Sequence, residues 1–210
     1  GTALITVDKV GSNTIVVVPG ANDKCDVAQV DRALASFSEP GILLVQHELS
    51  VRTVEHAIRV AKRAGWYVVL DPAPARSMSE GILELVDVVT PNESEAESIS
   101  GIPLRRREDA TAAAQALVAR GVRLAVVTLG AEGAVWSDGA NTGWIPSIAA
   151  DAVDTTAAGD AYTAGLAVAL AEGRPIVEAL RFAGAAGAFS VTRVGAQPSL
   201  GRRAEVDALL

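Results

Sequence analysis

The segment from Asp154 to Asp160 contains the residue types of a phosphoryl-transfer site. Ala157, Ala158 and Gly159 open a helix-like run after a turn, and the unpaired N–H groups of a first helical turn bind anions. Small side chains let a phosphate come close to that backbone. Asp160 would then accept a proton from an attacking hydroxyl group. The same residues suit an ordinary N-capped helix, so composition alone leaves both interpretations open.

Two shorter motifs also follow apolar runs. Asn92 and Glu95 are three residues apart, which places them on one face of a helix, and a simple capping pair is the alternative. Thr128 ends another apolar run and is followed by Gly130 and Gly133. These two glycines also suit a hairpin, so this motif is weak when taken alone.

Hydrophobic periodicity predicts alternating strands and helices that would position these residues. Strands are predicted at Thr2–Val7, Thr14–Val18, Ile42–Gln46, Trp66–Leu70, Val86–Val89 and Leu124–Leu129. Helices are predicted at Val27–Ser36, Val51–Arg63, Ser79–Leu85, Asp109–Arg120, Asp154–Glu172 and Pro175–Val191. Lys9–Asn13 would join the first two strands as a hairpin. The alternation thereafter indicates the doubly wound α/β class with a mostly parallel sheet.

In such sheets, ligands bind outside the carboxyl ends of the strands. Three of the polar segments follow predicted strands: Asp71–Pro74, Thr90–Asn92 and Thr128–Gly130. We therefore expect them to meet at one edge of the sheet.

Composition excludes several other classes of function. A formal net charge of −7 argues against a nucleic-acid or anionic-membrane surface, and no apolar stretch is long enough to span a bilayer. The single cysteine, Cys25, excludes an internal disulfide and favours a cytoplasmic location. His47 and His56 lie on dissimilar segments, which argues against a histidine zinc site.

Ala152–Asp160 resembles the C-terminal signature of the ribokinase family, within the wider group of phosphofructokinase-B-like sugar kinases. Thr90–Glu95, Thr128–Gly133 and Thr192–Ser199 resemble further family motifs. The resemblance runs over essentially the whole chain. It implies a three-layer α/β/α fold with a mostly parallel central sheet, formed as a single domain by residues 1–210.

The resemblance also implies the roles of the phosphoryl-transfer residues. Asp160 would be the catalytic base for the primary hydroxyl of a sugar, and the backbone of Ala157, Ala158 and Gly159 would form the anion hole. Glu95 would hold Mg²⁺ through water. The residues implied for ATP binding are Asn92, Thr128, Gly130, Gly133, Gly159 and Gly184. Relatives often carry Asn or His at the position of Gly184, so a side-chain contact to adenine is in doubt there.

A potassium ion is the other cofactor that the resemblance implies. Oxygen atoms of Asp154, Thr156, Ser190, Arg193, Gly195 and Ser199 would hold it beside the anion hole. A cation there would order the turn and strengthen its positive potential. A loop closed by Gly195 and Pro198 is the structural alternative.

For the sugar, Glu48 aligns with an acidic residue that hydrogen-bonds the substrate in ribokinases. Asp71 is a departure, because the family usually has Asn there. The implied reaction is transfer of the γ-phosphoryl group of ATP to a pentose, with D-ribose favoured. A relative acting on another sugar or nucleoside, or a non-catalytic nucleotide-binding fragment, are the alternatives.

The family has a large N-terminal segment before the position of Gly1, including most of a β lid. We therefore expect an N-terminally truncated fold in which Thr2–Val18 is the end of the lid. Because family members often dimerise through the lid, a homodimer of the full-length protein is left open.

Overall fold

The computed structural model describes residues 1–7 and 13–210, and its centre is a six-stranded sheet. In spatial order the strands are β3 (Ile42–Gln46), β4 (Tyr67–Asp71), β5 (Val88–Val89), β6 (Leu124–Thr128), β7 (Ala134–Ser137) and β8 (Thr142–Ile145). β3 to β6 pair in parallel, whereas β7 and β8 are antiparallel additions at one edge. The predicted mostly parallel sheet is confirmed.

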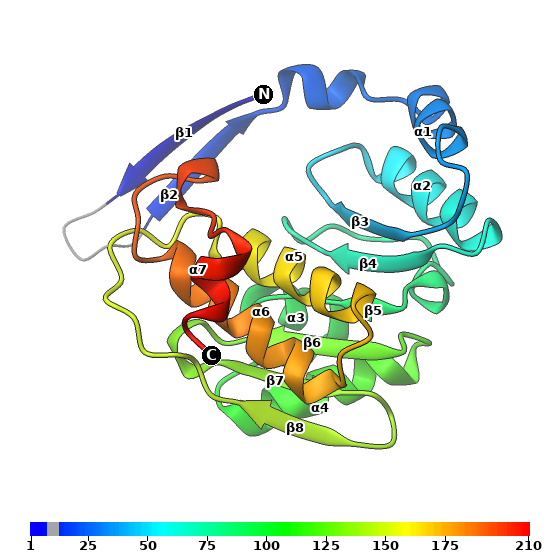
Figure 1. Cartoon of the computed structure of the whole chain (residues 1–210). Coiled ribbons are helices and arrows are strands. Elements are labelled where there is room, and N and C mark those ends of the chain that lie inside the picture. The colour runs from blue at the N-terminus through cyan, green and yellow to red at the C-terminus, as the bar shows by residue number, and fades with distance from the viewer. Residues whose placement is uncertain (8–12) are drawn as a thin grey trace.

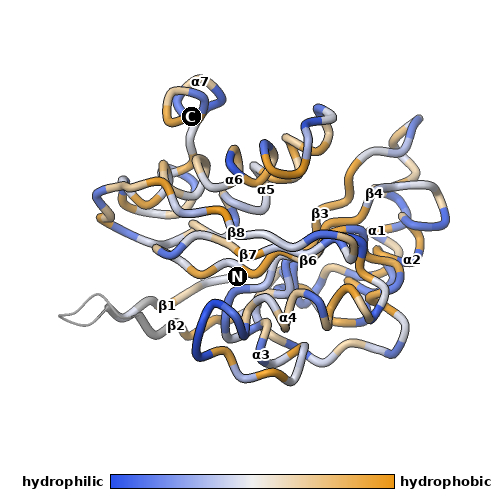
Figure 2. Tube along the Cα trace, turned by 90° about the horizontal axis from the view of Figure 1, so that it is seen from below, coloured by the Kyte–Doolittle hydropathy of each residue, from blue (hydrophilic) through white to orange (hydrophobic). Residues whose placement is uncertain are grey.

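Helices cover both faces of this sheet and make three layers, which Figure 2 shows from the side. On one face lie α2 (Val51–Arg63), α3 (Glu93–Ser100) and α4 (Arg107–Ala119), with α1 (Val27–Ala35) beside α2. On the other lie α5 (Ala158–Ala171) and α6 (Ile176–Ser190), followed by the short α7 (Arg203–Asp207). This arrangement confirms the three-layer α/β/α fold.

Residue alternation along the strands explains the two apolar cores. Side chains of a strand point to opposite faces in turn, so a strand covered on both faces is apolar throughout. In β4, Val68 and Leu70 pack with α2 and α4, whereas Val69 packs with α5 and α6. α5 and α6 approach each other closely: a Cβ added to Gly165 would lie only 2.9 Å from the Cβ of Ala186. Small residues at this contact therefore allow α5 and α6 to pack closely.

The N-terminal hairpin is separate from the central sheet (Figure 1). β1 (Thr2–Val7) and β2 (Asn13–Val18) are antiparallel, with Thr2 opposite Val18. Most of the turn predicted at Lys9–Asn13 lies outside the described residues. Leu4, Val16, Val17 and Val18 are more than half exposed.

Several expected elements differ from the structure. The predicted helix at Ser79–Leu85 is wrong: Gly81 adopts a left-handed φ of 76°, and only Leu83–Leu85 forms a short 3₁₀ turn. The helix predicted from Asp154 begins at Ala158. α3, β7 and β8 were not predicted. Other 3₁₀ turns lie at Gly20–Lys24, Gly130–Glu132 and Gln197–Ser199. Among the described residues, no helix has the length and apolar character to cross a bilayer.

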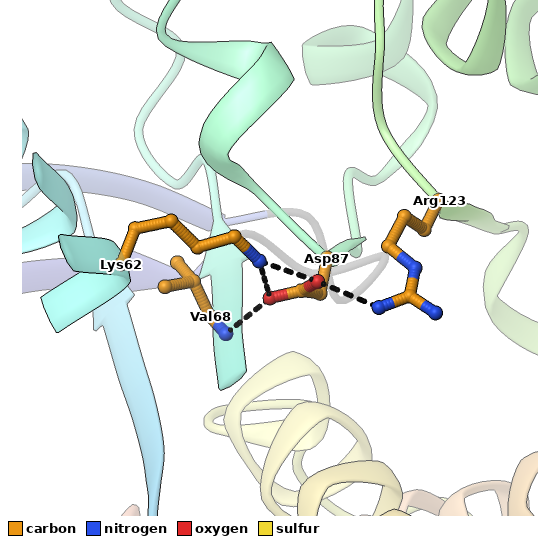
Figure 3. Close-up of polar contacts among 4 residues, drawn as sticks. All are labelled: Lys62, Val68, Asp87 and Arg123. Atoms are coloured by element: carbon orange, nitrogen blue, oxygen red, sulfur yellow. Dashed lines mark hydrogen bonds and ion pairs between the residues drawn. The ribbon is translucent and has the colours of Figure 1, made fainter. Parts of the chain in front are cut away.

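A buried carboxylate ties together the amino ends of the central strands (Figure 3). Asp87, just before β5, is 1% exposed and accepts hydrogen bonds from Lys62 Nζ at 2.6 and 2.7 Å. The backbone N–H of Val68 donates to it at 2.9 Å, and Arg123 Nη1 at 3.3 Å. One charge thus links α2, β4 and the start of β6.

We expect Lys62→Met to lower the free energy of unfolding by about 2 kcal/mol, because it removes the nearest positive charge from a buried carboxylate. Arg123→Met should cost less than about 1 kcal/mol, since the Arg123 side chain is 73% exposed and its pairing is screened by water. Urea denaturation of both variants measures the difference. Equal losses would contradict this ranking.

Candidate active site

The predicted meeting of polar segments at the carboxyl edge of the sheet is confirmed by the described residues. An isolated parallel bridge pairs Asn92 with Thr128, and the backbone N–H of Thr128 donates to the Pro91 oxygen at 2.9 Å. The loops after β3 and β4 are also joined, because the His47 N–H donates to the Ala73 oxygen at 2.8 Å. The edge therefore carries residues from four consecutive parallel strands.

The turn that precedes α5 has an unusual backbone. Ala157 has a φ of 61°, and among the described residues it is the one non-glycine with positive φ. No side chain from residues 1–7 or 13–210 caps the helix. The Ala158 N–H donates to the Thr155 oxygen at 3.2 Å, while those of Gly159 and Asp160 have no acceptor in the described part of the chain. A Cβ at Gly159 would meet nothing within 4 Å, so this turn offers free donors to an approaching anion.

Asp160 lies in the first turn of α5 and is exposed. The pKa of Asp160 is raised, mainly because the carboxyl is partly removed from water and secondly because of the nearby charge of Glu48. Glu48 itself is exposed, and its N–H is held by the Gln46 side chain at 2.9 Å. A carboxylate of raised pKa beside free N–H donors is suited to accept a proton.

Asn92 and Glu95 form the capping box that was the alternative interpretation of this motif. Asn92 Oδ1 accepts from the Glu95 N–H at 3.0 Å, and Glu95 Oε2 accepts from the Asn92 N–H at 2.9 Å. Glu95 is 6% exposed, and burial raises its pKa while the Asn92 hydrogen bonds oppose the rise. Its other oxygen, Oε1, accepts no hydrogen bond from the described part of the chain. Glu95 can therefore cap the helix through Oε2 and still offer Oε1 to a ligand.

A cavity of about 540 Å³ lies between α5, α6 and the antiparallel end of the sheet. Its size is within the range of small-molecule sites. The predicted nucleotide residues Thr128, Gly130, Gly133, Gly159 and Gly184 all line it, whereas Asn92 does not. Among the described residues, no charged side chain lines it. Such a surface suits the flat apolar faces of a base.

Glycine occupies two of these positions, 133 and 184, for different structural reasons. A Cβ at Gly133 would lie 2.1 Å from the Ile145 oxygen, so this residue must be glycine for β8 to approach. A Cβ at Gly184 would meet nothing within 4 Å, so Gly184 leaves open space in the cavity wall.

Tyr162 also lines the cavity but was not predicted as a site residue. It is 9% exposed, and its hydroxyl is buried without a hydrogen-bond partner in the described residues. Burial raises its pKa. Because an unsatisfied buried hydroxyl costs about 1–3 kcal/mol, we expect Tyr162→Phe to raise the free energy of unfolding by about 1 kcal/mol. Denaturation at neutral pH measures this, and a loss of stability would contradict it.

The residues predicted for potassium come from two loops that the structure brings together. Asp154 Oδ1 accepts from the Thr156 N–H at 2.9 Å and Oδ2 from the Gly195 N–H at 2.8 Å. Hydrogen bonding lowers the pKa of Asp154, first from the Thr156 side chain and then from the Gly195 and Thr156 backbone. The Ser190 and Ser199 hydroxyls are fully buried and donate to Gly187 and Ala196 oxygens. The Arg193 N–H donates to the Ser190 oxygen at 3.3 Å, and its side chain pairs with Glu205. Cation binding there stays a prediction.

Asp71, which the sequence places at this edge but not among the predicted site residues, has the carboxyl pKa that is raised most here. It is 6% exposed, and burial, then the charges of Glu95 and Asp160, raises its pKa to about 7. Thr163 donates to its Oδ2 at 3.4 Å. Four carboxyls therefore neighbour one another here in the order Glu48, Asp160, Asp71 and Glu95.

These acidic residues fit a partly hydrated Mg²⁺. In the part of the chain that the structure describes, no three His, Cys, Asp or Glu side chains form a ready metal cage. Mg²⁺ usually keeps several waters and is held by one or two carboxylates together with substrate phosphates. Glu95 Oε1, which accepts no hydrogen bond from the described residues, is one carboxylate oxygen that meets that requirement.

Known proteins resemble this chain along almost all of its length. The model of the pfkB family carbohydrate kinases matches residues 1–202. The ribokinase of Haemophilus influenzae is 40% identical over 205 residues, covering 98% of this chain and 67% of that protein. The deoxyribokinase of Salmonella typhi is 34% identical over 200 residues, covering 95% of this chain and 65% of that one. The structure of Arabidopsis thaliana ribokinase complexed with ribose and ATP is 31% identical with a TM-score of 0.86, covering 99% of this chain and 68% of that one.

The fold and the site together define an enzyme class that transfers phosphoryl groups to carbohydrates. The chain belongs to the pfkB family of carbohydrate kinases, which use ATP as the phosphoryl donor. It spans about two thirds of the length of the ribokinase and deoxyribokinase that it matches.

Proposed function

We propose that this chain transfers the γ-phosphoryl group of ATP to the primary hydroxyl of a pentose, with D-ribose as the favoured substrate and ribose 5-phosphate as the product. The observation that carries the proposal is the start of α5. There, Asp160 lies beside two free backbone N–H groups, and the preceding residues Ala158 and Gly159 line the cavity of about 540 Å³. A base and an anion site are two of the parts that enzymes use for phosphoryl transfer to a hydroxyl.

In this proposal the nucleotide occupies the cavity with its base between α6 and β8 and its phosphates toward α5. The N–H groups of Gly159 and Asp160 stabilise charge on the transferred group, and Asp160 takes the proton of the sugar hydroxyl. Glu95 would hold Mg²⁺ through water, and that ion would neutralise phosphate charge. Asp154 and the loop of Gly195 would hold K⁺ and keep the turn ordered.

Glu48 is proposed to bind the sugar. It follows β3, and its charge is near enough to Asp160 to raise the pKa of that residue. A carboxylate in this place can accept hydrogen bonds from two sugar hydroxyls. The similarity to a deoxyribokinase makes 2-deoxyribose the second candidate substrate, because the two sugars differ by a single hydroxyl.

The test is ADP release with ribose, 2-deoxyribose or fructose, in the presence of Mg²⁺ and either K⁺ or Na⁺. Two proteins are assayed: this chain, and a chimera carrying the part of the Haemophilus influenzae ribokinase that precedes the matched region. Turnover with ribose that rises with K⁺ supports the proposal. Preference for 2-deoxyribose supports the second candidate. ATP binding without transfer to any sugar in either protein overturns both.

A further inference from the structure

Three buried polar side chains connect α5 to the carboxyl ends of the central strands. The Thr163 hydroxyl lies 2.9 Å from the hydroxyl of Thr90, directly after β5, and 3.4 Å from Asp71 Oδ2, at the end of β4. The three residues are 2%, 4% and 6% exposed. Buried polar groups are costly unless they are paired, so this chain of hydrogen bonds fixes its members relative to one another.

When Asp71 is ionised and can only accept, the direction of these bonds follows from the number of protons. A threonine hydroxyl has one proton, so when Thr163 donates to Asp71 it can only accept from Thr90. Removing the Thr163 hydroxyl would therefore break both bonds and leave Thr90 and Asp71 without this partner.

In this hydrogen-bonded group, Thr163 lies one helical turn after Asp160. Residues three apart on a helix are neighbours. Anchoring Thr163 to the strand ends therefore fixes the rotation of this part of α5, and with it the direction in which the Asp160 side chain points. In the described part of the chain, no side chain caps the start of α5, and its first residues, Ala158 and Gly159, are small. Among the described residues of α5, Thr163 is the one buried side chain that hydrogen-bonds to strand ends.

We propose that Thr163 is a positioning residue for Asp160: through Asp71 and Thr90 it sets the place of the catalytic carboxylate relative to β4 and β5. The inference rests on the proposed function, because it assigns Asp160 the part of the base. A displacement of about 1 Å in a catalytic group can cost about 100-fold in rate. The hydrogen-bond chain thus acts on catalysis without touching the substrate.

The kinetic test compares Thr163→Val, which removes the hydroxyl, with Thr163→Ser, which keeps it. In whichever protein gives sugar-dependent turnover, Thr163→Val should lower kcat by about 10- to 100-fold and change both KM values by less than about 3-fold. Thr163→Ser should keep most of kcat. Thr111→Val is the matched control, because the Thr111 hydroxyl donates only within its own helix, to the Arg107 oxygen.

Hydrogen exchange of the backbone amides at the start of α5 gives a second readout that needs no turnover. Thr163→Val should speed exchange at residues 159–163 at least about 10-fold at a temperature where the variant stays folded, whereas Thr163→Ser should not. Unchanged exchange overturns the inference. Faster exchange with unchanged kcat also overturns it, since the role is then only structural. If neither this protein nor the chimera gives turnover, the proposed function fails. Hydrogen exchange alone then decides whether the hydrogen bonds of Thr163 anchor the helix.

Discussion

Asp160→Asn is expected to lower kcat for the sugar by about 10²- to 10⁴-fold while ATP affinity stays within a few-fold. Asparagine keeps the size of the side chain and the free N–H groups of the turn but cannot accept the proton. Because the pKa of Asp160 is raised, the rate of the unmodified protein should fall as pH drops through that pKa, and this acid limb should be absent from the variant. Initial rates across a pH series measure both effects.

Asp207→Asn is the matched control for this substitution. Asp207 pairs with Arg203 in α7, and it lies neither in the cavity nor at the start of α5. It should leave kcat unchanged. Normal turnover of Asp160→Asn would remove Asp160 from the role of base, and loss of ATP binding would point instead to damage of the anion site.

Asp71→Asn should stabilise the folded protein at about pH 8 by as much as about 4 kcal/mol, with the gain vanishing toward pH 4. Raising the pKa from 3.8 to about 7 corresponds to that free energy. The folded state holds this proton more tightly than the unfolded state, so stability falls as pH rises between the two pKa values. Asparagine carries no such charge, and its stability should lack this decline.

Urea denaturation of both proteins at several pH values from about 4 to about 8 measures the difference. Asp151→Asn provides the control, because Asp151 is an exposed carboxylate in a loop and should change neither stability nor its pH dependence. A variant that is less stable than the unmodified protein at about pH 8 would show that ionised Asp71 is well solvated or paired.

Much of the fold could be predicted because its signals are local. The apolar runs of β3, β4 and β6 and the helical spacing of α2 each depend on neighbours in sequence. α3 was missed because it has eight residues and buries only Glu95 and Ala96, so it has almost no apolar face, although Asn92 and Glu95 do form its capping box. The Asp138–Gly139 pair between β7 and β8 was an unused hairpin signal.

Some features of the candidate site could also be predicted from local sequence, and others could not. The residues that follow strands, such as Asn92 and Thr128, could be predicted to meet because parallel strands end at one edge. The contacts of Thr163 could not, since its partners are 73 and 92 residues away in sequence. The unusual pKa of Asp71 likewise depends on burial and on charges from α3 and α5, which no local pattern encodes.

The Asp87 ion pairs have a consequence for how this protein tolerates mutation. They hold the amino ends of β4 to β6, at the edge opposite the one that carries Asp160 and Asp71. Substitutions at Lys62 or Arg123 can therefore adjust thermal resistance without disturbing phosphoryl transfer. At the other edge, the crowding of carboxyls that suits catalysis opposes folding. Selection for heat tolerance and selection for activity should thus act on different ends of the same strands.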